Sequence, residues 1–318
     1  MIEFENVSFS YTGQEHGGLH DINLKISDGE CVLFCGRSGC GKTTITRLVN
    51  GLIPQFYQGD IHGRVLVDGQ EISNIPMYQI AAKVGSVFQN PRTQFFNVDT
   101  DSEIAFGIEN EARPPQELIE RVEQTADDLR IQKLRNRNIF ELSGGEKQKI
   151  AFASVYAMNP QIYLLDEPSS NLDMTSIQEL KEHLRLIKKQ GKTILIAEHR
   201  LYYLTELADR IVYLEKGEIK GERSLKRLAD AFGVQGKDKW ETAQIVAEKV
   251  IADLYKPEYE KMELVEKLAY APRFKRWQEL GILPGGAKSE VFHGVVKCST
   301  NLNSDPVDML TDCLKLGI

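Results

Sequence analysis

The residues with the clearest chemical potential form a glycine-rich loop after a short apolar run. Residues 36–43 read GRSGCGKT, which has the spacing G-x4-G-K-[ST], and they follow CVLFC at 31–35. Glycine lets backbone N–H groups turn inward toward phosphate oxygens, and the N-terminus of a following helix attracts the same anion. A glycine-rich turn without a ligand is the alternative, but the preceding strand and following helix favour a nucleotide site. The spacing predicts that Lys42 reaches the β- and γ-phosphates of ATP and that the Thr43 hydroxyl binds Mg²⁺. The other predicted nucleotide-binding residues of this loop are Gly36, Ser38, Gly39, Cys40, Gly41 and Thr44.

Two carboxylates end a second apolar run. IYLL at 162–165 is followed directly by Asp166 and Glu167. The end of a strand in a parallel sheet lies at the crevice where ligands bind. We expect Asp166 to hold Mg²⁺, through water, and Glu167 to orient and polarise the attacking water as a general base. An acidic surface turn is the alternative, which the phosphate loop in the same chain makes less attractive.

The elements that must position these residues alternate between strands and helices, which predicts an α/β fold with a parallel sheet. Antiparallel strands at the start and a hairpin near the end, around Lys216-Gly217, predict a small β-subdomain laid against that sheet. Segments 240–254, 258–270 and 305–316 predict a mostly α C-terminal module. The expected strands are 2–9, 19–26, 31–35, 64–67, 84–88, 162–165, 193–197 and 210–219. The expected helices are a run that follows residues 36–44 and ends at Leu52, and the segments 115–131, 143–158 and 175–190.

Composition narrows the class of protein. The net charge of −7 argues against nucleic acid as a partner, because such binders usually carry a basic balance. No run approaches the roughly 20 apolar residues of a membrane-spanning helix, and the first residues alternate like a strand rather than a signal peptide. We therefore expect a cytoplasmic chain that reaches a membrane only through a partner. The spacing of Cys31, Cys35 and Cys40 lacks a metal-binding pair and favours small buried residues.

A third motif, which contains two glycines, connects the first two motifs to a known family. Residues 142–148 read LSGGEKQ, and with this signature segment the sequence resembles the ATP-binding-cassette superfamily. The resemblance implies a P-loop NTPase core with a parallel sheet, an antiparallel β-subdomain and a helical subdomain. It also implies that two cassettes sandwich two ATP molecules, so that each needs a second cassette. Ser143, Gly144, Gly145 and Glu146 would then face the γ-phosphate held by the other subunit.

Four further residues take roles from this resemblance. Tyr11 matches the aromatic residue that stacks on adenine, and Asp173 matches the loop that crosses the dimer interface. Gln89 matches the glutamine that senses Mg²⁺, the attacking water and the transmembrane partner. His199 matches the histidine that contacts the γ-phosphate. The predicted catalytic residues are therefore Glu167, His199 and Gln89, and the predicted metal-binding residues are Thr43, Gln89 and Asp166.

Two segments, 50–69 and 87–110, resemble energy-coupling-factor transporter ATPases, which drive uptake of vitamins or of nickel and cobalt ions. This resemblance implies an ATPase subunit that is peripheral on the cytoplasmic face of the cell membrane. Its partners would be a second cassette, a transmembrane coupling protein and a membrane substrate-binding subunit. Gln94, Phe95 and Phe96 are the expected contacts to the coupling protein. A cassette ATPase that acts on ribosomes or DNA is the alternative, but no second cassette, coiled coil or basic patch is visible.

The sequence changes character after Glu222, which predicts a cassette over 1–222 and a helical tail over 223–318. From about Leu225 the tail resembles an internal stretch of nickel–iron carbon monoxide dehydrogenase, through 280–292 and 299–318. Cys298, Cys313 and His293 are far apart and lack ligand spacing, so dehydrogenase activity is not expected. An inactive fragment related to that enzyme is the third interpretation of the chain. Because every nucleotide motif precedes Glu222, we expect the tail to be dispensable for ATP hydrolysis.

Overall fold

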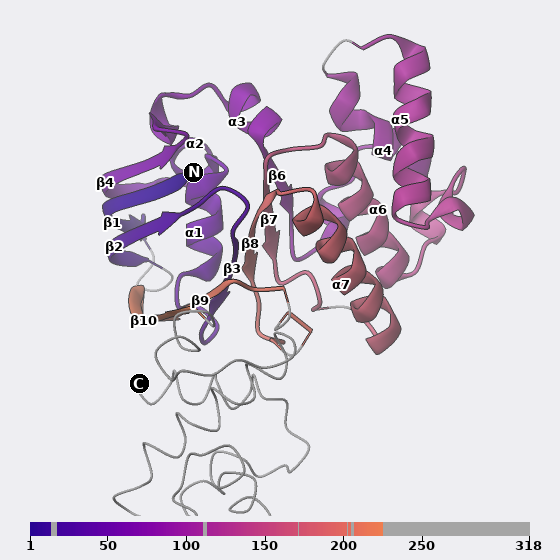
Figure 1. The fold of residues 1–318 in the computed structure, drawn as a ribbon. Helices are drawn as coiled ribbons and strands as arrows, with labels where there is room; N and C mark the ends of the chain where they lie inside the picture. Colours follow the sequence, from indigo (N-terminus) through magenta and orange to yellow (C-terminus); the bar gives the residue numbers. More distant parts are fainter. Residues whose placement is uncertain (14–17, 111–112, 171, 202, 205–206, 225–318) are drawn as a thin grey trace, which may run out of the picture. The chain divides into compact units, whose positions relative to one another are not determined.

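Figure 1 shows the computed structural model, which describes residues 1–13, 18–110, 113–170, 172–201, 203–204 and 207–224. The chain divides into two compact units. The first unit comprises Met1–Tyr203 and Arg210–Lys220, and the second comprises Leu204–Asp209 and Gly221–Ile318. The C-terminal helices expected from the sequence lie outside the described residues.

An antiparallel sheet of four strands begins the chain, with the order β2-β1-β4-β5. The strands are β1 (Ile2–Tyr11), β2 (Leu19–Ile26), β4 (Gly59–Val67) and β5 (Gln70–Glu71). The apolar residues that alternate along β1 point into the core: Ile2, Phe4, Val7 and Phe9 are buried. This sheet is the predicted β-subdomain, and β4 begins five residues before the predicted start at Arg64.

A sheet of six strands holds the chemistry-bearing residues, with the order β10-β9-β3-β8-β7-β6. β3 pairs in parallel with β8 and β9, and β7 pairs in parallel with β6 and β8. All residues of β3 and β8 are buried, as their uninterrupted apolar sequences predict. The strands are β3 (Cys31–Cys35), β6 (Val84–Val87), β7 (Ile162–Asp166), β8 (Thr193–Ala197), β9 (Arg210–Glu215) and β10 (Glu218–Ser224).

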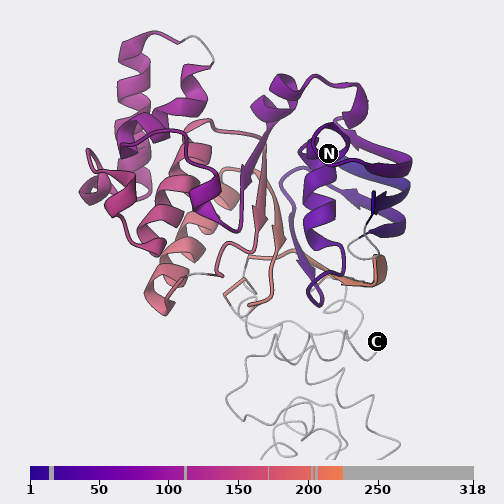
Figure 2. The same cartoon turned by 180° about the vertical axis from the view of Figure 1, so that it is seen from behind.

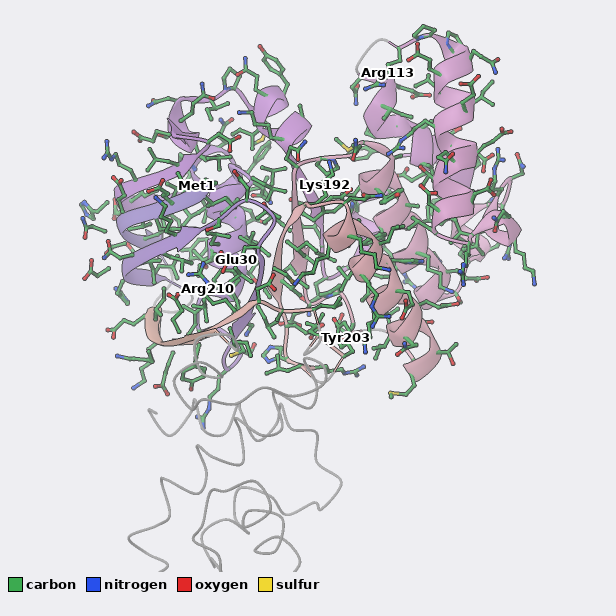
Figure 3. All side chains as sticks on the ribbon, in the orientation of Figure 1. Met1, Glu30, Arg113, Lys192, Tyr203 and Arg210 are labelled. Carbon is green, nitrogen blue, oxygen red and sulfur yellow. The ribbon has the colours of Figure 1, made fainter. Side chains whose placement is uncertain are left out.

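The hairpin near residue 216 corrects one expectation. It turns at Lys216 and Gly217, both with positive φ, as predicted. However, its first strand, β9, lies beside β3 in the six-stranded sheet and not in the antiparallel β-subdomain. The apolar run in β9 is buried like that of a parallel strand, and Arg210 pairs with Glu30 at 2.8 Å immediately before β3 (Figure 3). Burial of this apolar run and the ion pair therefore explain why the hairpin joins the six-stranded sheet and not the antiparallel sheet.

Four longer helices flank the sheets, and α4, α5 and α6 gather on the side away from the antiparallel sheet (Figures 1 and 2). Their starts follow local signals: Asp99 caps α4, Pro115 begins α5, and Ser143 caps α6 in a reciprocal capping box with Glu146. The bounds are α4 (Thr100–Glu109), α5 (Pro115–Asp128), α6 (Gly144–Ala157) and α7 (Met174–Lys189).

The helix predicted to run to Leu52 is shorter in the structure. α1 (Lys42–Val49) ends before Gly51, whose φ of 74° is left-handed, and α2 (Leu52–Gln55) is a separate turn. α3 (Met77–Lys83) and α4 were not predicted as helices. Among the described residues, no helix has the length and apolar character needed to cross a membrane.

Candidate nucleotide-binding and hydrolysis site

The backbone of the phosphate loop needs glycine at two positions. Gly36 has φ 146°, and a Cβ there would lie 2.2 Å from the Leu214 carbonyl oxygen. Gly41 has φ 108°, and its Cβ would lie 2.6 Å from Leu19 Cδ2. Gly41 is the N-cap of α1 and has no side chain that could accept a hydrogen bond from the first N–H groups of this helix. The loop therefore presents an open helix N-terminus that suits an anion.

Lys42 is a buried cation in this loop, with 5% of its surface exposed. Its Nζ donates to the carbonyl oxygens of Gly36 at 2.9 Å and Arg37 at 3.1 Å. Within the described part of the chain, no carboxylate pairs with this ammonium group, and a buried charge without a counter-charge is unfavourable. A triphosphate would supply the missing anion, so the surroundings of Lys42 fit ATP.

Thr43 and Asp166 meet at the carboxyl end of β7, with the Thr43 hydroxyl donating to Asp166 Oδ1 at 3.1 Å. Burial raises the pKa of the Asp166 carboxyl above its usual range, and the Thr43 hydrogen bond lowers it by less. A cation at this position would favour the ionised form again. No group of three His, Cys, Asp or Glu side chains that could hold a metal occurs among the residues described. One hydroxyl and one carboxylate, completed by phosphates and water, is the donor set that Mg²⁺ prefers.

Glu167 follows β7 in a strained conformation, with φ at 44°. Its N–H donates to the Ala197 carbonyl at 2.8 Å, which ties it to the end of β8. Gln89 Nε2 donates to Glu167 Oε2 at 2.7 Å, and His199 Nε2 lies 3.0 Å from Oε1. The three predicted catalytic residues therefore converge from the carboxyl ends of β6, β7 and β8.

His199 stands between an acid and a base. The same Nε2 atom lies 3.3 Å from Lys42 Nζ and 3.0 Å from Glu167 Oε1. A neutral imidazole nitrogen can accept from the ammonium or donate to the carboxylate, but one nitrogen cannot do both. The presence or absence of a proton on Nε2 therefore decides whether His199 hydrogen-bonds to Glu167 or to Lys42.

Tyr11 lies beside the start of α1, as its predicted role requires. Its hydroxyl is 3.2 Å from Thr44 Oγ1 and accepts from Arg47 at 3.0 Å. The Arg47 guanidinium lies 3.9 Å from the centre of the Tyr57 ring. Arg47 and Tyr57 were not predicted to belong to this site. The position of Arg47, one helical turn after Thr43, is the sequence signal that could have found it.

The signature segment does not join the phosphate loop within this chain. Ser143 Oγ accepts from the Glu146 N–H at 3.3 Å, and Glu146 accepts from the Ser143 N–H at 2.8 Å and from Arg137 at 3.1 Å. The Ser143 N–H also holds the pKa of Glu146 below its usual range. In the described structure, these bonds stay on α6 and Arg137, and none reaches residues 36–44. A Cβ on Gly144 would meet open space, so this helix start can be approached from outside.

Asp173, the fourth family residue, caps α7. Its carboxylate accepts from the Ser176 N–H at 2.8 Å, and that backbone bond lowers its pKa. Asp173 thus fixes the end of the segment that follows Glu167, while its predicted place at a dimer interface stays a prediction.

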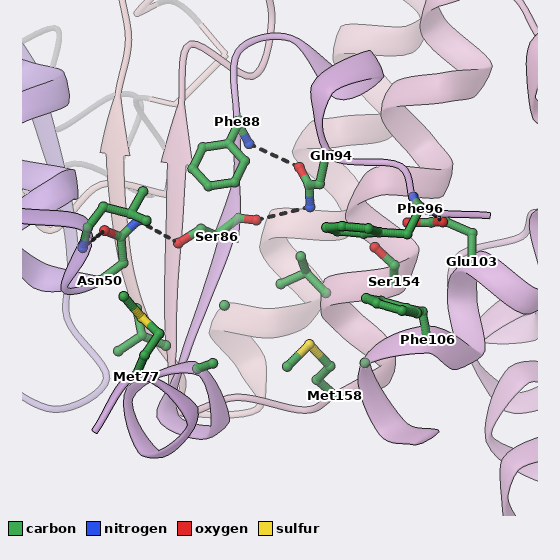
Figure 4. A pocket seen from close by; sticks show the side chains of 16 residues that line it. Asn50, Met77, Ser86, Phe88, Gln94, Phe96, Glu103, Phe106, Ser154 and Met158 are labelled. Atoms are coloured by element: carbon green, nitrogen blue, oxygen red, sulfur yellow. Dashed lines mark hydrogen bonds between the residues drawn. The ribbon is translucent and has the colours of Figure 1, made fainter. Parts of the chain in front are cut away.

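An apolar groove of about 290 Å³ lies between β6, α3, α4 and α6 (Figure 4). Gln94 builds one wall, since its side chain donates to the Ser86 carbonyl at 3.1 Å and accepts from the Phe88 N–H at 3.3 Å. The Phe96 ring stacks on Phe106 at 4.8 Å and remains 74% exposed. Two of the three predicted partner contacts, Gln94 and Phe96, line this groove, whereas Phe95 does not.

Comparison with known proteins identifies the family. The ABC transporter family profile matches residues 19–170. A putative ABC transporter ATP-binding protein of Pyrococcus horikoshii is 41% identical over 220 residues, which cover 69% of this chain and 78% of that protein. One of Treponema denticola is 56% identical over 230 residues, or 72% of this chain and 47% of the relative. The chain belongs to the family of ABC transporter ATP-binding proteins, although it spans about half the length of the Treponema denticola relatives it matches.

Solved structures show the same fold. The cbiO1 protein of Clostridium perfringens, part of the cbiONQ ABC transporter complex, superposes with a TM-score of 0.64 at 26% identity, over 81% of this chain and 96% of that one. The dimeric MJ0796 cassette bound to ADP and Pi gives a TM-score of 0.62 at 25% identity, over 70% and 98% of the two chains. These matches confirm the predicted P-loop fold. The ligands expected for a cassette of this family are ATP and Mg²⁺.

A second family profile, described as Prismane/CO dehydrogenase, matches residues 173–318. It agrees with the predicted resemblance of the tail but starts earlier than Leu225. Its first part coincides with α7, β8 and β9, which belong to the cassette fold described above. The part of the match from residue 225 onward lies outside the described residues.

Proposed function

We propose that this chain is the ATP-hydrolysing subunit of a membrane uptake transporter of the energy-coupling-factor type, importing a vitamin or a transition-metal ion. The groove beside β6 carries this proposal. Gln94 fixes one wall of the groove through hydrogen bonds to the backbone of Ser86 and Phe88. Phe96, seven residues after Gln89 in the sequence, is 74% exposed in this groove. A helix of a transmembrane coupling protein in the groove would cover that ring and act on the loop that holds Glu167. Similarity to cbiO1, which is part of an ABC transporter complex, supports a role in a transporter complex.

The proposed chemistry follows from the convergence at the strand ends. Hydrolysis would transfer the γ-phosphoryl group of ATP to water with ADP as the leaving group, and Mg²⁺ would offset the negative charge of that group. Glu167 orients a water molecule and takes its proton, while Gln89 holds the carboxylate at 2.7 Å. Lys42 exchanges its carbonyl partners for phosphate oxygens, and His199 passes from Glu167 to the γ-phosphate. Thr43 and Asp166 would hold the cation, and Tyr11 would stack on adenine.

A second cassette is part of the proposal. The start of α6 is exposed at Gly144, where an added Cβ would meet open space. Ser143, Gly144 and Gly145 would bind the γ-phosphate of the opposing subunit, and Asp173 would lie at the interface. In this proposal the cassette comprises 1–222, sits on the cytoplasmic face of the membrane, and carries a tail over 223–318 without a role in hydrolysis.

The test is a purification of the tagged full chain from detergent-solubilised membranes of its native host. We expect two kinds of multi-span membrane protein in a fixed ratio with two cassettes, and ATP turnover that rises when they are present. A chain that sediments with ribosomes or DNA, and whose turnover rises with those instead, would establish the soluble cassette ATPase.

A further inference from the structure

Glu198 is a buried carboxylate at the carboxyl end of β8, directly before His199, and it is 2% exposed. Its Oε1 accepts from the backbone N–H groups of His199 at 2.7 Å and Arg200 at 3.1 Å. Its Oε2 accepts from the Ser169 N–H at 3.2 Å and from the Tyr203 hydroxyl at 2.9 Å. Four donors therefore surround one carboxylate, which satisfies its buried charge.

These donors come from two different loops of the site. His199 and Arg200 belong to the loop after β8, whereas Ser169 lies two residues after Glu167, in the segment 169–173 that ends at the α7 cap. Arg200 makes the same connection from the surface, because its guanidinium donates to the carbonyl oxygens of Ser169 and Leu172, each at 3.3 Å. The two loops are thus joined by a buried acid on one side and an exposed base on the other.

The chemistry of the donors explains why the residue is an acid. Only a carboxylate offers acceptor capacity on both oxygens and no donor. Glutamine would keep the two bonds to His199 and Arg200 if its oxygen faced them. Its amide nitrogen would then face the Ser169 N–H, donor against donor, while Tyr203 could reverse and accept. Glu198→Gln therefore removes one connection selectively, the one to Ser169.

We propose that Glu198 and Arg200 are positioning residues that fix the His199 loop to segment 169–173, so that the two move as one body when a second cassette contacts that segment. The inference rests on the proposed cassette dimer. Since His199 lies 3.0 Å from Glu167, a displacement of segment 169–173 would be transmitted to the catalytic carboxylate through Glu198. Contact at the interface would in this way set the geometry of hydrolysis.

The test compares full-length Glu198→Gln with the parent protein in steady-state ATP turnover and in the affinity of the monomer for a fluorescent ATP analogue. We expect kcat to fall about tenfold, the effect of one charge-assisted hydrogen bond, with KM and analogue affinity within about twofold. In a Glu167→Gln background, Glu198→Gln should also weaken ATP-dependent dimerisation about tenfold. Loosened folding would instead lower analogue affinity and the melting temperature together, and that result would overturn the proposal, as would an unchanged kcat.

Two controls keep the test decisive. Tyr203→Phe removes a donor to the same carboxylate oxygen but leaves both loops connected, so its kcat should stay within about twofold of the parent. Arg200→Ala should reduce kcat several-fold without threatening the core, even where Glu198→Gln does not fold. Arg64→Ala removes an exposed arginine that is paired with Glu5, and this control variant should keep the kcat of the parent protein. Equal losses in all of these variants would refute the inference.

The proposed hydrolytic function and the proposed positioning role of Glu198 can be refuted by different results. Normal turnover of Glu167→Gln would remove the proposed hydrolytic mechanism whatever Glu198→Gln does. Slow turnover of Glu167→Gln together with normal turnover of Glu198→Gln and Arg200→Ala would remove only the coupling role.

Discussion

Lys42 offers the sharpest test of the nucleotide site, because the chain contains a matched lysine elsewhere. Lys42 is 5% exposed and donates to two backbone carbonyls, those of Gly36 and Arg37. Lys147 is 7% exposed and also donates to two carbonyls, of Phe140 at 3.2 Å and Leu142 at 2.7 Å. If Lys42 only braced its loop, the two lysines would be equivalent. If it binds phosphate, only Lys42→Ala should change nucleotide affinity.

The magnitude follows from the bonds that ATP would gain. A hydrogen bond between charged groups in a partly buried site contributes about 1.5–3 kcal/mol, so Lys42→Ala should raise the Kd for ATP by roughly 10- to 150-fold. Removing Lys147 also leaves two carbonyl groups without their lysine partner, but it removes no contact to the phosphates of ATP. We therefore expect Lys147→Ala to bind ATP within about twofold of the parent.

The assay is fluorescence titration of a mant-ATP analogue into each full-length variant with Mg²⁺, alongside thermal melting. A cooperative melting transition shows that each variant is folded, so that the nucleotide affinities of folded proteins are compared. The reasoning would be refuted by a folded Lys42→Ala with unchanged affinity. It would be refuted equally by a Lys147→Ala that loses as much affinity as Lys42→Ala.

Four further outcomes follow from the site. Glu167→Gln should bind ATP normally, form a stable ATP-bound dimer and turn over very slowly, and near-normal turnover would exclude the base role. Asp166→Asn should raise the melting temperature at pH 7 while abolishing Mg²⁺-dependent turnover. Burial raises the pKa of the folded-state carboxyl, so the melting difference should shrink as the pH falls through that pKa, and a lower melting temperature at pH 7 would contradict this. Phe96→Ala should weaken binding of the membrane partner by roughly 500-fold, because roughly 150 Å² of ring surface would no longer be buried in the complex, with little loss of stability. Ile119→Ala, an exposed apolar residue of α5, is its control and should bind the partner normally. Truncation after Glu222 should leave turnover unchanged, which a folded but inactive truncated chain would disprove.

The convergence of the catalytic residues could be predicted because it follows from sheet topology. Gln89, Glu167 and His199 each follow an apolar run, and the carboxyl ends of parallel strands meet at one edge. Short motifs placed at strand ends therefore specify a site without knowledge of the side-chain geometry. In the structure, Gln89 and His199 lie 2.7 Å and 3.0 Å from Glu167, and the roles of the three residues in hydrolysis stay predictions.

The elements that were missed have weak local patterns. α4 holds Thr100, Glu103 and Ser102 among its apolar residues, so its sequence lacks a clear amphipathic stripe. Glu103 is nevertheless buried, because it accepts from the backbone N–H groups of Phe96 at 3.0 Å and Asn97 at 2.8 Å. A bond between a helix and the preceding loop depends on tertiary structure and leaves no periodic signal. The place of β9 was missed for a similar reason, since hairpin geometry alone does not indicate which sheet receives it.

The site concentrates features that oppose the stability of the free protein. Lys42 is a buried cation without a carboxylate partner among the described residues, Asp166 is a carboxylate that burial discourages from ionising, and Glu167 has a left-handed backbone. Two of these costs would be offset by parts of the same ligand: phosphate for Lys42 and Mg²⁺ for Asp166. The buried acid Glu198 differs, because its four donors all come from the chain itself. Lys42 and Asp166 therefore need a ligand to offset their burial, whereas Glu198 does not. For this reason we assign Glu198 a positioning role rather than a chemical one.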